Sequence, residues 1–280
     1  MRTTVVGSYP VPDWLKASPT EEALQDALRV VLRVQEETGI DVISDGELSR
    51  WDLTRRQPGG MVERFVRLMG GVEAHPSRMQ RDTHRARATT AYRPDPPGVV
   101  VGPLSEGRLD LHHEWQRVRR LTQRALKFTV TSPYMIGKLL LDEHYGDLSQ
   151  LVLAVADVLA EQVRAVDAEV VQIDEPNLPG TPGDGGLAGE AIGRVLDAAR
   201  GEKAVHLCFG NFGGQTIQQG HYSQLVEFLN TLRCDHLVLE TTRRPQAELE
   251  RLRDVDARIA LGVGVIDVKD LQIESAEVVA

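Results

Sequence analysis

The sequence predicts an α/β protein with a TIM (β/α)8-type barrel. Short segments rich in β-branched residues alternate with longer amphipathic segments along the whole chain. Strands that alternate with helices pair in parallel and are covered by those helices. The 280 residues fit one barrel, and 41% hydrophobic residues are enough for a large core. We therefore expect a single barrel domain over residues 1–280.

The strands are expected where short apolar, β-branched runs occur. Seven such runs follow one another: Thr3–Ser8, Asp41–Ser44, Lys127–Thr131, Val170–Ile173, Ala204–Cys208, His236–Glu240 and Ile259–Val265. A closed barrel of this type has eight strands. We therefore expect the eighth strand to be missing and the C-terminal end to be truncated, with Glu274–Ala280 as the beginning of a helix.

The helices are expected where apolar residues recur at helical spacing. These segments are Glu22–Glu37, Leu148–Val166, Ala188–Ala199 and Gln246–Arg253, the last beginning after Pro245. His112 and His113 are interpreted as the start of another helix. Residues 75–107, rich in Arg, Pro, Gly and Asp, are interpreted as an insertion after the second strand, with a short strand at Val99–Val101.

Charge and cysteine content limit the partners and the compartment. The net charge of −9 argues against nucleic acid, because phosphate binding needs clustered Lys and Arg. The two cysteines fit a reducing compartment rather than a disulfide scaffold. No apolar run approaches the roughly 20 residues of a membrane span, and no signal peptide is evident. We expect a cytoplasmic protein that binds neither membrane nor nucleic acid; its oligomeric state is not predicted.

His206, Cys208 and Glu240 form a candidate metal site. Residues i and i+2 of a strand point to the same face, so His206 and Cys208 can meet one ion, and Glu240 ends the next predicted strand. Imidazole and thiolate suit Zn²⁺. The alternative is a core histidine and a small buried thiol. Cys234 is rejected as a ligand because it precedes Glu240 by six residues, about 20 Å along a strand.

Acidic residues also follow the predicted strands. Asp174 and Glu175 come after an apolar run, where they can bind an ammonium group or transfer protons; the alternative is a helix-capping loop. Asp45 and Glu47 have the same i, i+2 spacing as the metal pair, and their alternative is a solvated turn. The sequence therefore predicts a polar site at this end of the barrel.

Six motifs, in this order, resemble the catalytic half of cobalamin-independent methionine synthase and its shorter single-barrel relatives, which include epoxyalkane:coenzyme M transferases. They are TTVVGSYP, GIDVISDGELSRWD, VVQIDEPNL, VHLCFGN, HLVLETTRR and LGVGVIDVKD. The stretch from His206 through GNFGGQTIQ looks closest to the short-chain relatives. The resemblance implies a TIM barrel that transfers a methyl group to a zinc-bound thiolate, that of homocysteine in the best-known case.

The resemblance also implies roles for individual residues. His206, Cys208 and Glu240 match zinc ligands, and Ser8, Glu47 and Asp174 match residues that hold the amino-acid part of homocysteine. Asp267 and Lys269 match catalytic positions, with Lys269 in place of the family's histidine. The family's fourth zinc ligand, a cysteine in an Asp-Cys-Gly stretch, has no counterpart in the sequence.

The expected function is therefore zinc-dependent methyl transfer to a small thiol, most simply from methylfolate or a methyl-corrinoid to homocysteine. One alternative is alkyl transfer to coenzyme M, for whose sulfonate Arg243, Arg244 and Lys269 offer positive charge. The other is a degenerate, non-catalytic barrel that binds a metal or a thiol.

Overall fold

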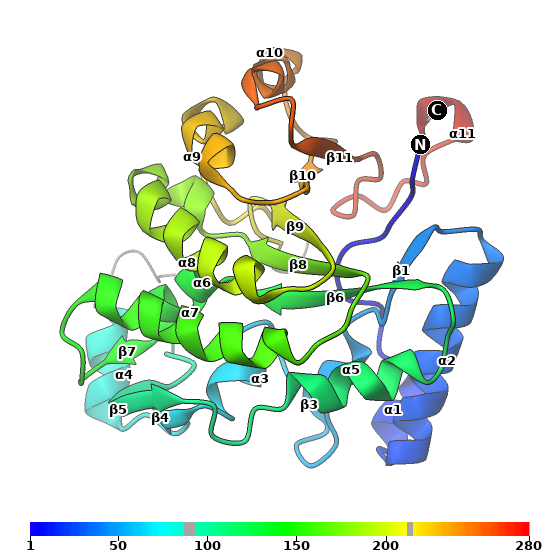
Figure 1. Cartoon of the computed structure of the whole chain (residues 1–280). Coiled ribbons are helices and arrows are strands. Elements are labelled where there is room, and N and C mark those ends of the chain that lie inside the picture. Colours follow the sequence, from blue (N-terminus) through cyan, green and yellow to red (C-terminus); the bar gives the residue numbers. More distant parts are fainter. Residues whose placement is uncertain (87–92, 94, 212–214, 280) are drawn as a thin grey trace.

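A curled parallel sheet forms the centre of the computed structural model, which describes residues 1–86, 93, 95–211 and 215–279 (Figure 1). The sheet has six strands in the order β1-β6-β8-β9-β10-β11, and every neighbouring pair is parallel. The strands span Val42–Ser44 (β1), Ala125–Thr131 (β6), Val170–Glu175 (β8), Glu202–Leu207 (β9), His236–Glu240 (β10) and Ala260–Gly264 (β11).

The observed strands confirm the predicted TIM-type α/β class. Six of the seven expected runs are strands of this sheet, within one or two residues of the expected ends. The exception is Thr3–Ser8, which was expected to be a full strand. It meets the sheet through a single parallel bridge between Thr4 and Val42. Among the described residues, β11 has a paired strand only on its β10 side, so the sheet is curled but open there.

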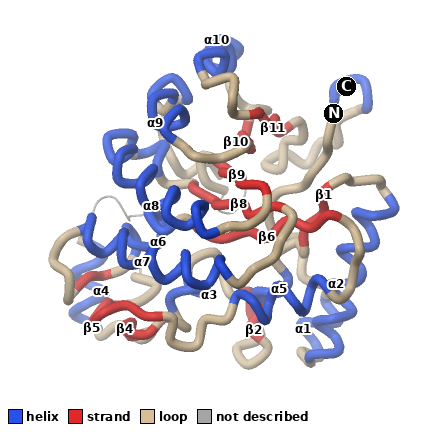
Figure 2. Tube along the Cα trace, viewed as in Figure 1, coloured by secondary structure: helices blue, strands red, loops and turns tan. Residues whose placement is uncertain are grey.

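Helices follow the strands and pack on the outer face of the sheet (Figure 2). The predicted helices are confirmed with slightly shifted ends, and polar side chains cap several of them: Thr20 accepts from Ala23 N at 3.1 Å and Asp147 from Gln150 N at 2.9 Å. The helices are α1 (Asp13–Ala17), α2 (Glu21–Glu37), α3 (Glu63–Val66), α4 (Arg78–Arg85), α5 (Leu111–Arg119), α6 (Pro133–Leu139), α7 (Leu148–Arg164), α8 (Gly185–Ala198), α9 (Val226–Thr231), α10 (Gln246–Glu250) and α11 (Ala276–Val279). His112 and His113 lie at the start of α5, as expected.

The apolar core lies between this sheet and its helices. On β8, Val171 and Ile173 are completely buried and belong to the same cluster as the buried face of α7. The opposite, inner face of the sheet is different, because it carries buried Lys127, Gln172 and Asp174. Burying polar groups is unfavourable unless they are bonded, so their presence makes the inner face the candidate functional face. No helix within the described ranges has the length and apolar character to cross a membrane.

The predicted insertion is partly built into a second sheet. β4 (Gly70–Glu73), β5 (Val99–Ser105) and β7 (Leu141–Asp142) form three strands, and β5 extends the strand expected at Val99–Val101. A short hairpin, β2 (Trp51–Asp52) with β3 (Gln57–Pro58), precedes them. Helix α4 was not expected within the insertion. Its capping box, formed by Ser77 and Gln80, is the sequence signal that identifies it. Residues 87–92 and 94 of the insertion lie outside the described residues.

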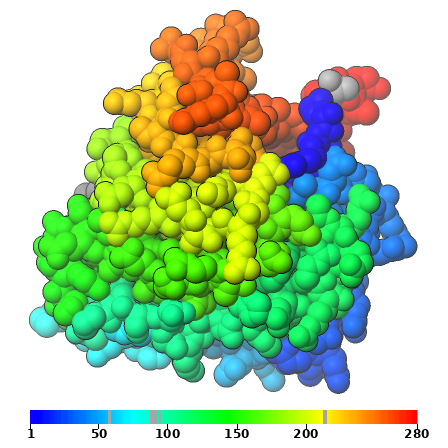
Figure 3. Space-filling view, in the orientation of Figure 1, coloured from blue at the N-terminus to red at the C-terminus, as the bar shows by residue number. Residues whose placement is uncertain are grey.

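The first residues and the segment after β11 both project from the body at the upper right of Figure 3. Leu271 and Ile273, in the C-terminal segment, are 100% and 92% exposed. Two shorter parts of these segments turn back to the body, because Ser8 bonds to Glu47 and Lys269 bonds to Glu240.

Candidate active site at the C-terminal ends of the strands

Most of the predicted site residues collect at one end of the central sheet. β8, β9 and β10 run parallel, so their C-terminal ends meet at the same edge (Figure 1). Asp174 lies one residue before the end of β8, Cys208 directly follows β9, and Glu240 ends β10. This is the edge at which parallel barrels place their chemistry.

The strand register sets four of these side chains on the same face. Asp174 on β8 is the register partner of His206 on β9. The register of β9 with β10 places Glu240 at the height of Cys208, one residue beyond the last paired position. Register partners in a parallel sheet and alternate residues of one strand share a face. The four side chains therefore belong to the inner face, as the sequence predicts.

The hydrogen bonding of His206 suits a neutral metal ligand. Its Nδ1 lies 2.8 Å from the carbonyl oxygen of Val238. A carbonyl only accepts, so Nδ1 carries the proton and Nε2 keeps its lone pair. Burial lowers the pKa of the imidazole, although neighbouring Asp174 opposes this shift. Metal-binding histidines commonly have their second nitrogen fixed in this way.

Cys208 is a half-buried thiol rather than a free thiolate. Burial, together with the nearby carboxylates of Glu240 and Asp174, raises its pKa to about 12. The thiol is therefore protonated at neutral pH, and a positive centre is needed to remove the proton. Cys234 lies before β10, at the opposite end of that strand from Glu240, which agrees with its rejection as a ligand.

Glu240 has both carboxylate oxygens engaged by the protein. Oε1 accepts a short hydrogen bond from Lys269 Nζ, and Oε2 accepts from Phe209 N at 3.3 Å. The Lys269 side chain is only 2% exposed, so this ion pair is shielded from solvent. Lys269 therefore neutralises the carboxylate that the sequence assigns to the metal.

The ligand types of His206, Cys208 and Glu240 fit Zn²⁺, although the three side chains do not converge on one point. Across the described parts of the chain, no group of three or more His, Cys, Asp or Glu residues is placed to hold one metal ion. The three predicted ligands nevertheless share one edge and one face. An imidazole with a free Nε2, a thiol and a carboxylate are ligands that zinc prefers. Rotation of Glu240 away from Lys269 is the change that would free its oxygen.

Asp267 serves the backbone around Lys269. Its Oδ1 accepts from Lys269 N at 2.9 Å, and its Oδ2 accepts from Arg243 Nε at 2.6 Å. The hydrogen bond with Arg243 lowers the pKa of this carboxyl group. Asp267 is thus an ionised residue that orients the Lys269 segment, and its carboxylate is occupied by these contacts.

Ser8 and Glu47 meet although they lie on different segments. Ser8 Oγ donates a short hydrogen bond to Glu47 Oε2. Glu47 also pairs with Arg50 at 3.0 Å and has a φ of 60°, a left-handed conformation that is unusual for a residue other than glycine. Asp45 holds this turn by accepting from Glu47 N at 2.9 Å. Strained backbone of this kind is often found at functional sites.

Asp174 lies on the inner face, where Glu47 and Arg50 are among its electrostatic neighbours. The side chain is buried, and burial raises the pKa of its carboxyl group, with Glu47 adding to the rise while His206 and Arg50 oppose it. Ser8, Glu47 and Asp174 therefore belong to one electrostatic neighbourhood. A ligand ammonium group would relieve the repulsion between its two carboxylates.

Glu175, the other half of the predicted acid pair, has a structural role. Its Oε1 accepts from Asn177 N at 2.6 Å and from Leu178 N at 2.9 Å. The carboxylate therefore caps the turn after β8, which is the alternative that the sequence left open. Only Asp174 of this pair faces the site.

Two buried cations, Arg50 and Lys127, were not predicted from the sequence. Arg50 is 7% exposed and donates to Thr129 O at 2.9 Å as well as pairing with Glu47. Lys127 is 3% exposed and lies within β6. The available signal was a lysine at the first position of the predicted strand Lys127–Thr131.

The cations considered for a sulfonate acceptor are engaged by the protein itself. Arg243 pairs with Asp267, and the Arg244 guanidinium lies 3.3 Å from the centroid of the Phe209 ring. Lys269 pairs with Glu240. Each of the three cations that would bind the sulfonate of coenzyme M therefore already has a partner within the protein. Residues 212–214 of the GNFGGQTIQ stretch lie outside the described residues.

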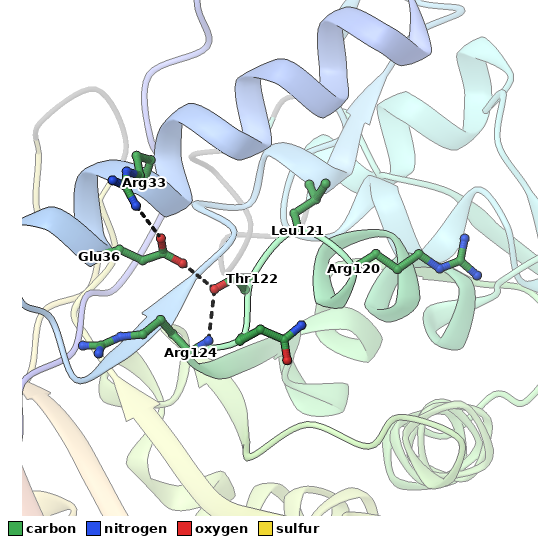
Figure 4. Close-up of a pocket in the computed structure, with 7 residues that line it drawn as sticks. Arg33, Glu36, Arg120, Leu121, Thr122 and Arg124 are labelled. Atoms are coloured by element: carbon green, nitrogen blue, oxygen red, sulfur yellow. Dashed lines mark hydrogen bonds and ion pairs between the residues drawn. The ribbon is translucent and has the colours of Figure 1, made fainter.

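A surface hollow at the other end of the barrel has a different character. Its lining includes Arg33, Arg120 and Arg124, and it lies where α2 ends and β6 begins (Figure 4). The arginine side chains point apart, and Glu36 pairs with Arg33 within the hollow. Residues at this N-terminal end of a barrel usually serve stability.

Comparison with known proteins supports the resemblance seen in the motifs. The family model described as the catalytic domain of cobalamin-independent synthase matches residues 1–280. The methionine synthase of Thermococcus kodakarensis is 28% identical, over 99% of this chain and 79% of that protein. The methionine synthase of Saccharolobus islandicus is 29% identical, over 99% of this chain and 80% of that protein.

Solved structures show the same fold. A B12-independent methionine synthase from Shewanella sp. W3-18-1, in complex with selenomethionine, has a TM-score of 0.78 and 25% identity, over 99% of this chain and 83% of that one. A putative vitamin-B12-independent methionine synthase from Listeria monocytogenes has a TM-score of 0.69 at 16% identity, a likeness of fold.

Proposed function

Because the chain belongs to the family of cobalamin-independent methionine synthase catalytic domains, and so to a group of methyltransferases, we propose that it methylates homocysteine in a zinc-dependent reaction. The observation that carries this proposal is the shared inner face of Asp174, His206, Cys208 and Glu240 at the C-terminal edge of the sheet. Ammonium-binding and thiol-activating groups thereby lie on neighbouring strands.

His206, Cys208 and Glu240 are the residues that would hold the metal. The neutral imidazole offers Nε2, and the Cys208 thiol gives up its proton on binding. Glu240 is the ligand that exchanges partners most readily, because Lys269 provides a second, internal site for its carboxylate. Bound zinc would lower the pKa of the substrate thiol and so supply a thiolate at neutral pH.

The amino-acid part of homocysteine would be held by Asp174, Glu47 and Ser8. An ammonium group between the two carboxylates would form charge-assisted hydrogen bonds, which are stronger than neutral ones. Fixing the substrate in this way directs its sulfur towards the donor's methyl carbon. The sulfur then bonds to that carbon as the donor's bond to it breaks, and the donor leaves with the bonding electron pair.

The acceptor is the point at which the competing functions differ. A sulfonate acceptor needs an available cation, whereas Arg243, Arg244 and Lys269 are all engaged by groups of the protein. These contacts support an ammonium-bearing acceptor over coenzyme M. The donor, methylfolate or a methyl-corrinoid, stays open within the proposal, and a non-catalytic metal- or thiol-binding barrel stays the alternative from another class.

An activity screen tests this function. Zinc-loaded protein would be incubated with L-homocysteine and either 5-methyltetrahydropteroyltriglutamate or methylcobalamin, and methionine would be quantified. Coenzyme M and 4-mercaptobutyrate, which lacks the amino group, serve as comparison acceptors. Methionine formation that is lost after zinc removal supports the proposal. Faster methylation of coenzyme M, or no product with either donor, contradicts it.

A further inference from the structure

Lys127 is a buried cation on the inner face to which the proposed function gives no role. It is the register partner of Ser44 on β1 and of Val170 on β8, and only 3% of its surface is exposed. A lysine is rarely buried without a specific partner, because removing its charge from water is unfavourable.

The ammonium group of Lys127 joins two parts of the acceptor site. Its Nζ donates to Val5 O at 2.7 Å and to Gln172 Oε1 at 2.8 Å. Val5 belongs to the first segment, which carries Ser8 three residues later and which meets the sheet through the single bridge at Thr4. Arg2 pairs with Glu202 of β9 and Tyr9 N donates to Gly46 O at 2.9 Å, and Lys127 adds an attachment at Val5, between these two contacts.

The bond to Gln172 fixes the direction of its amide. Lysine can only donate, so the amide oxygen must face Lys127 and the amide nitrogen must face away. That nitrogen donates to Asp174 Oδ1 at 2.6 Å. Without Lys127, the amide can flip and turn its oxygen towards the carboxylate. Lys127 thus ensures that Gln172 donates to Oδ1 of Asp174, which leaves Oδ2 for the substrate ammonium group.

The charge of Lys127 favours the ionised form of the Asp174 carboxylate. The carboxylates of Asp174 and Glu47 are its electrostatic partners, and burial lowers its pKa to about 8. The protein therefore maintains a positive charge between carboxylates at the expense of stability. A hydrophobic residue would pack in the same place without that penalty.

We propose that Lys127 is a positioning residue that sets the amino-group subsite of the thiol acceptor. Through Gln172 it orients Asp174, and through Val5 it fixes the segment that carries Ser8. The inference rests on the proposed function, since it assumes an acceptor with an ammonium group.

Binding of two acceptors separates this role from a general effect on folding. The affinities of zinc-loaded protein for L-homocysteine and for 4-mercaptobutyrate would be measured by calorimetry. The variants are Lys127→Met and Gln172→Leu, which breaks the link to Asp174 but leaves the bond to Val5. Lys138→Met is the matched control, because that half-buried lysine bonds to Tyr134, Thr181 and Asp184 instead.

We expect the unmodified protein to prefer homocysteine by roughly tenfold or more, the size of a charge-assisted bond. Lys127→Met and Gln172→Leu should lose most of this preference and keep their affinity for 4-mercaptobutyrate, while Lys138→Met should retain the preference. If Lys127→Met does not fold, Gln172→Leu carries the test alone. Equal weakening of both acceptors, or an unchanged preference in both variants, overturns the inference. An unmodified protein without any preference contradicts the proposed function instead.

Discussion

Lys269 and Glu240 form a shielded ion pair at the point where the sequence predicts a metal ligand. The lysine side chain is 2% exposed and the glutamate side chain 15% exposed. A cation in contact with a ligand carboxylate both occupies it and repels a divalent ion. If zinc binds here as proposed, this pair would weaken its binding.

Replacement of Lys269 by methionine should strengthen zinc binding. One positive charge within a few Å of the ion is unfavourable by more than about 1.4 kcal/mol at an effective dielectric constant near 20, so the affinity should rise roughly tenfold or more. Competition with a chelator measures it, and Lys138→Met is the control. An unchanged or lower affinity in Lys269→Met would show that the pair does not oppose the metal.

Zinc content should depend on His206 and Cys208 but not on Cys234. Each of the first two supplies a donor atom on the inner face, whereas Cys234 precedes β10 at its opposite end. Elemental analysis should show zinc lost from His206→Ala and from Cys208→Ser and retained in Cys234→Ser. Full zinc content in either of the first two variants would remove that residue from the ligand set.

Asp174→Asn should weaken acceptor binding far more than metal binding. The substitution keeps the shape of the side chain but removes the charge that pairs with an ammonium group. We expect a loss of roughly 1.5–3 kcal/mol in homocysteine affinity. Calorimetry on zinc-loaded protein measures it, with 4-mercaptobutyrate as the acceptor that should be unaffected. Equal losses for both acceptors would show that Asp174 does not contact the amino group.

Lys127 should make stability depend on pH in the alkaline range. Its pKa in the folded protein is about 8, below the ordinary value of 10.5. Between these values the unfolded chain binds more protons, so the free energy of unfolding rises with pH, by roughly 3 kcal/mol in total. Below pH 8 both states are protonated and the penalty is complete.

Urea unfolding at several pH values compares the protein with Lys127→Met. The stability of the unmodified protein relative to the variant should rise between about pH 8 and 10.5 and stay level below pH 8. A difference that does not change with pH would mean that Lys127 titrates normally.

Much of the fold follows from the sequence because each strand is a short apolar run that precedes a turn signal. The first segment is the exception. Thr3–Ser8 has strand composition, but pairing depends on neighbours distant in the chain, and only Thr4 bridges to the sheet. Composition also concealed α4, since an Arg-rich helix lacks the apolar stripe by which helices are recognised.

The sequence predicts the face of the sheet on which a site side chain lies, because alternate residues of a strand point to the same face. It does not predict which distant residue a side chain bonds to. The spacing of His206 and Cys208, together with strand order, was enough to place both on one face with Glu240. The partner of Glu240 was not predictable, because Lys269 reaches it from a different segment. The sequence does not distinguish the roles of Asp174 and Glu175. The structure does, because Glu175 accepts a hydrogen bond from Asn177 N in the turn after β8.

X-ray absorption at the zinc edge tests the central claim, that homocysteine reacts as a zinc-bound thiolate. The zinc-loaded protein alone should show one sulfur neighbour, from Cys208, at about 2.3 Å, with nitrogen and oxygen completing the site. Addition of L-homocysteine should raise the count to two sulfurs and reduce the oxygen contribution as Glu240 is released. An unchanged sulfur count under saturating homocysteine would contradict the claim.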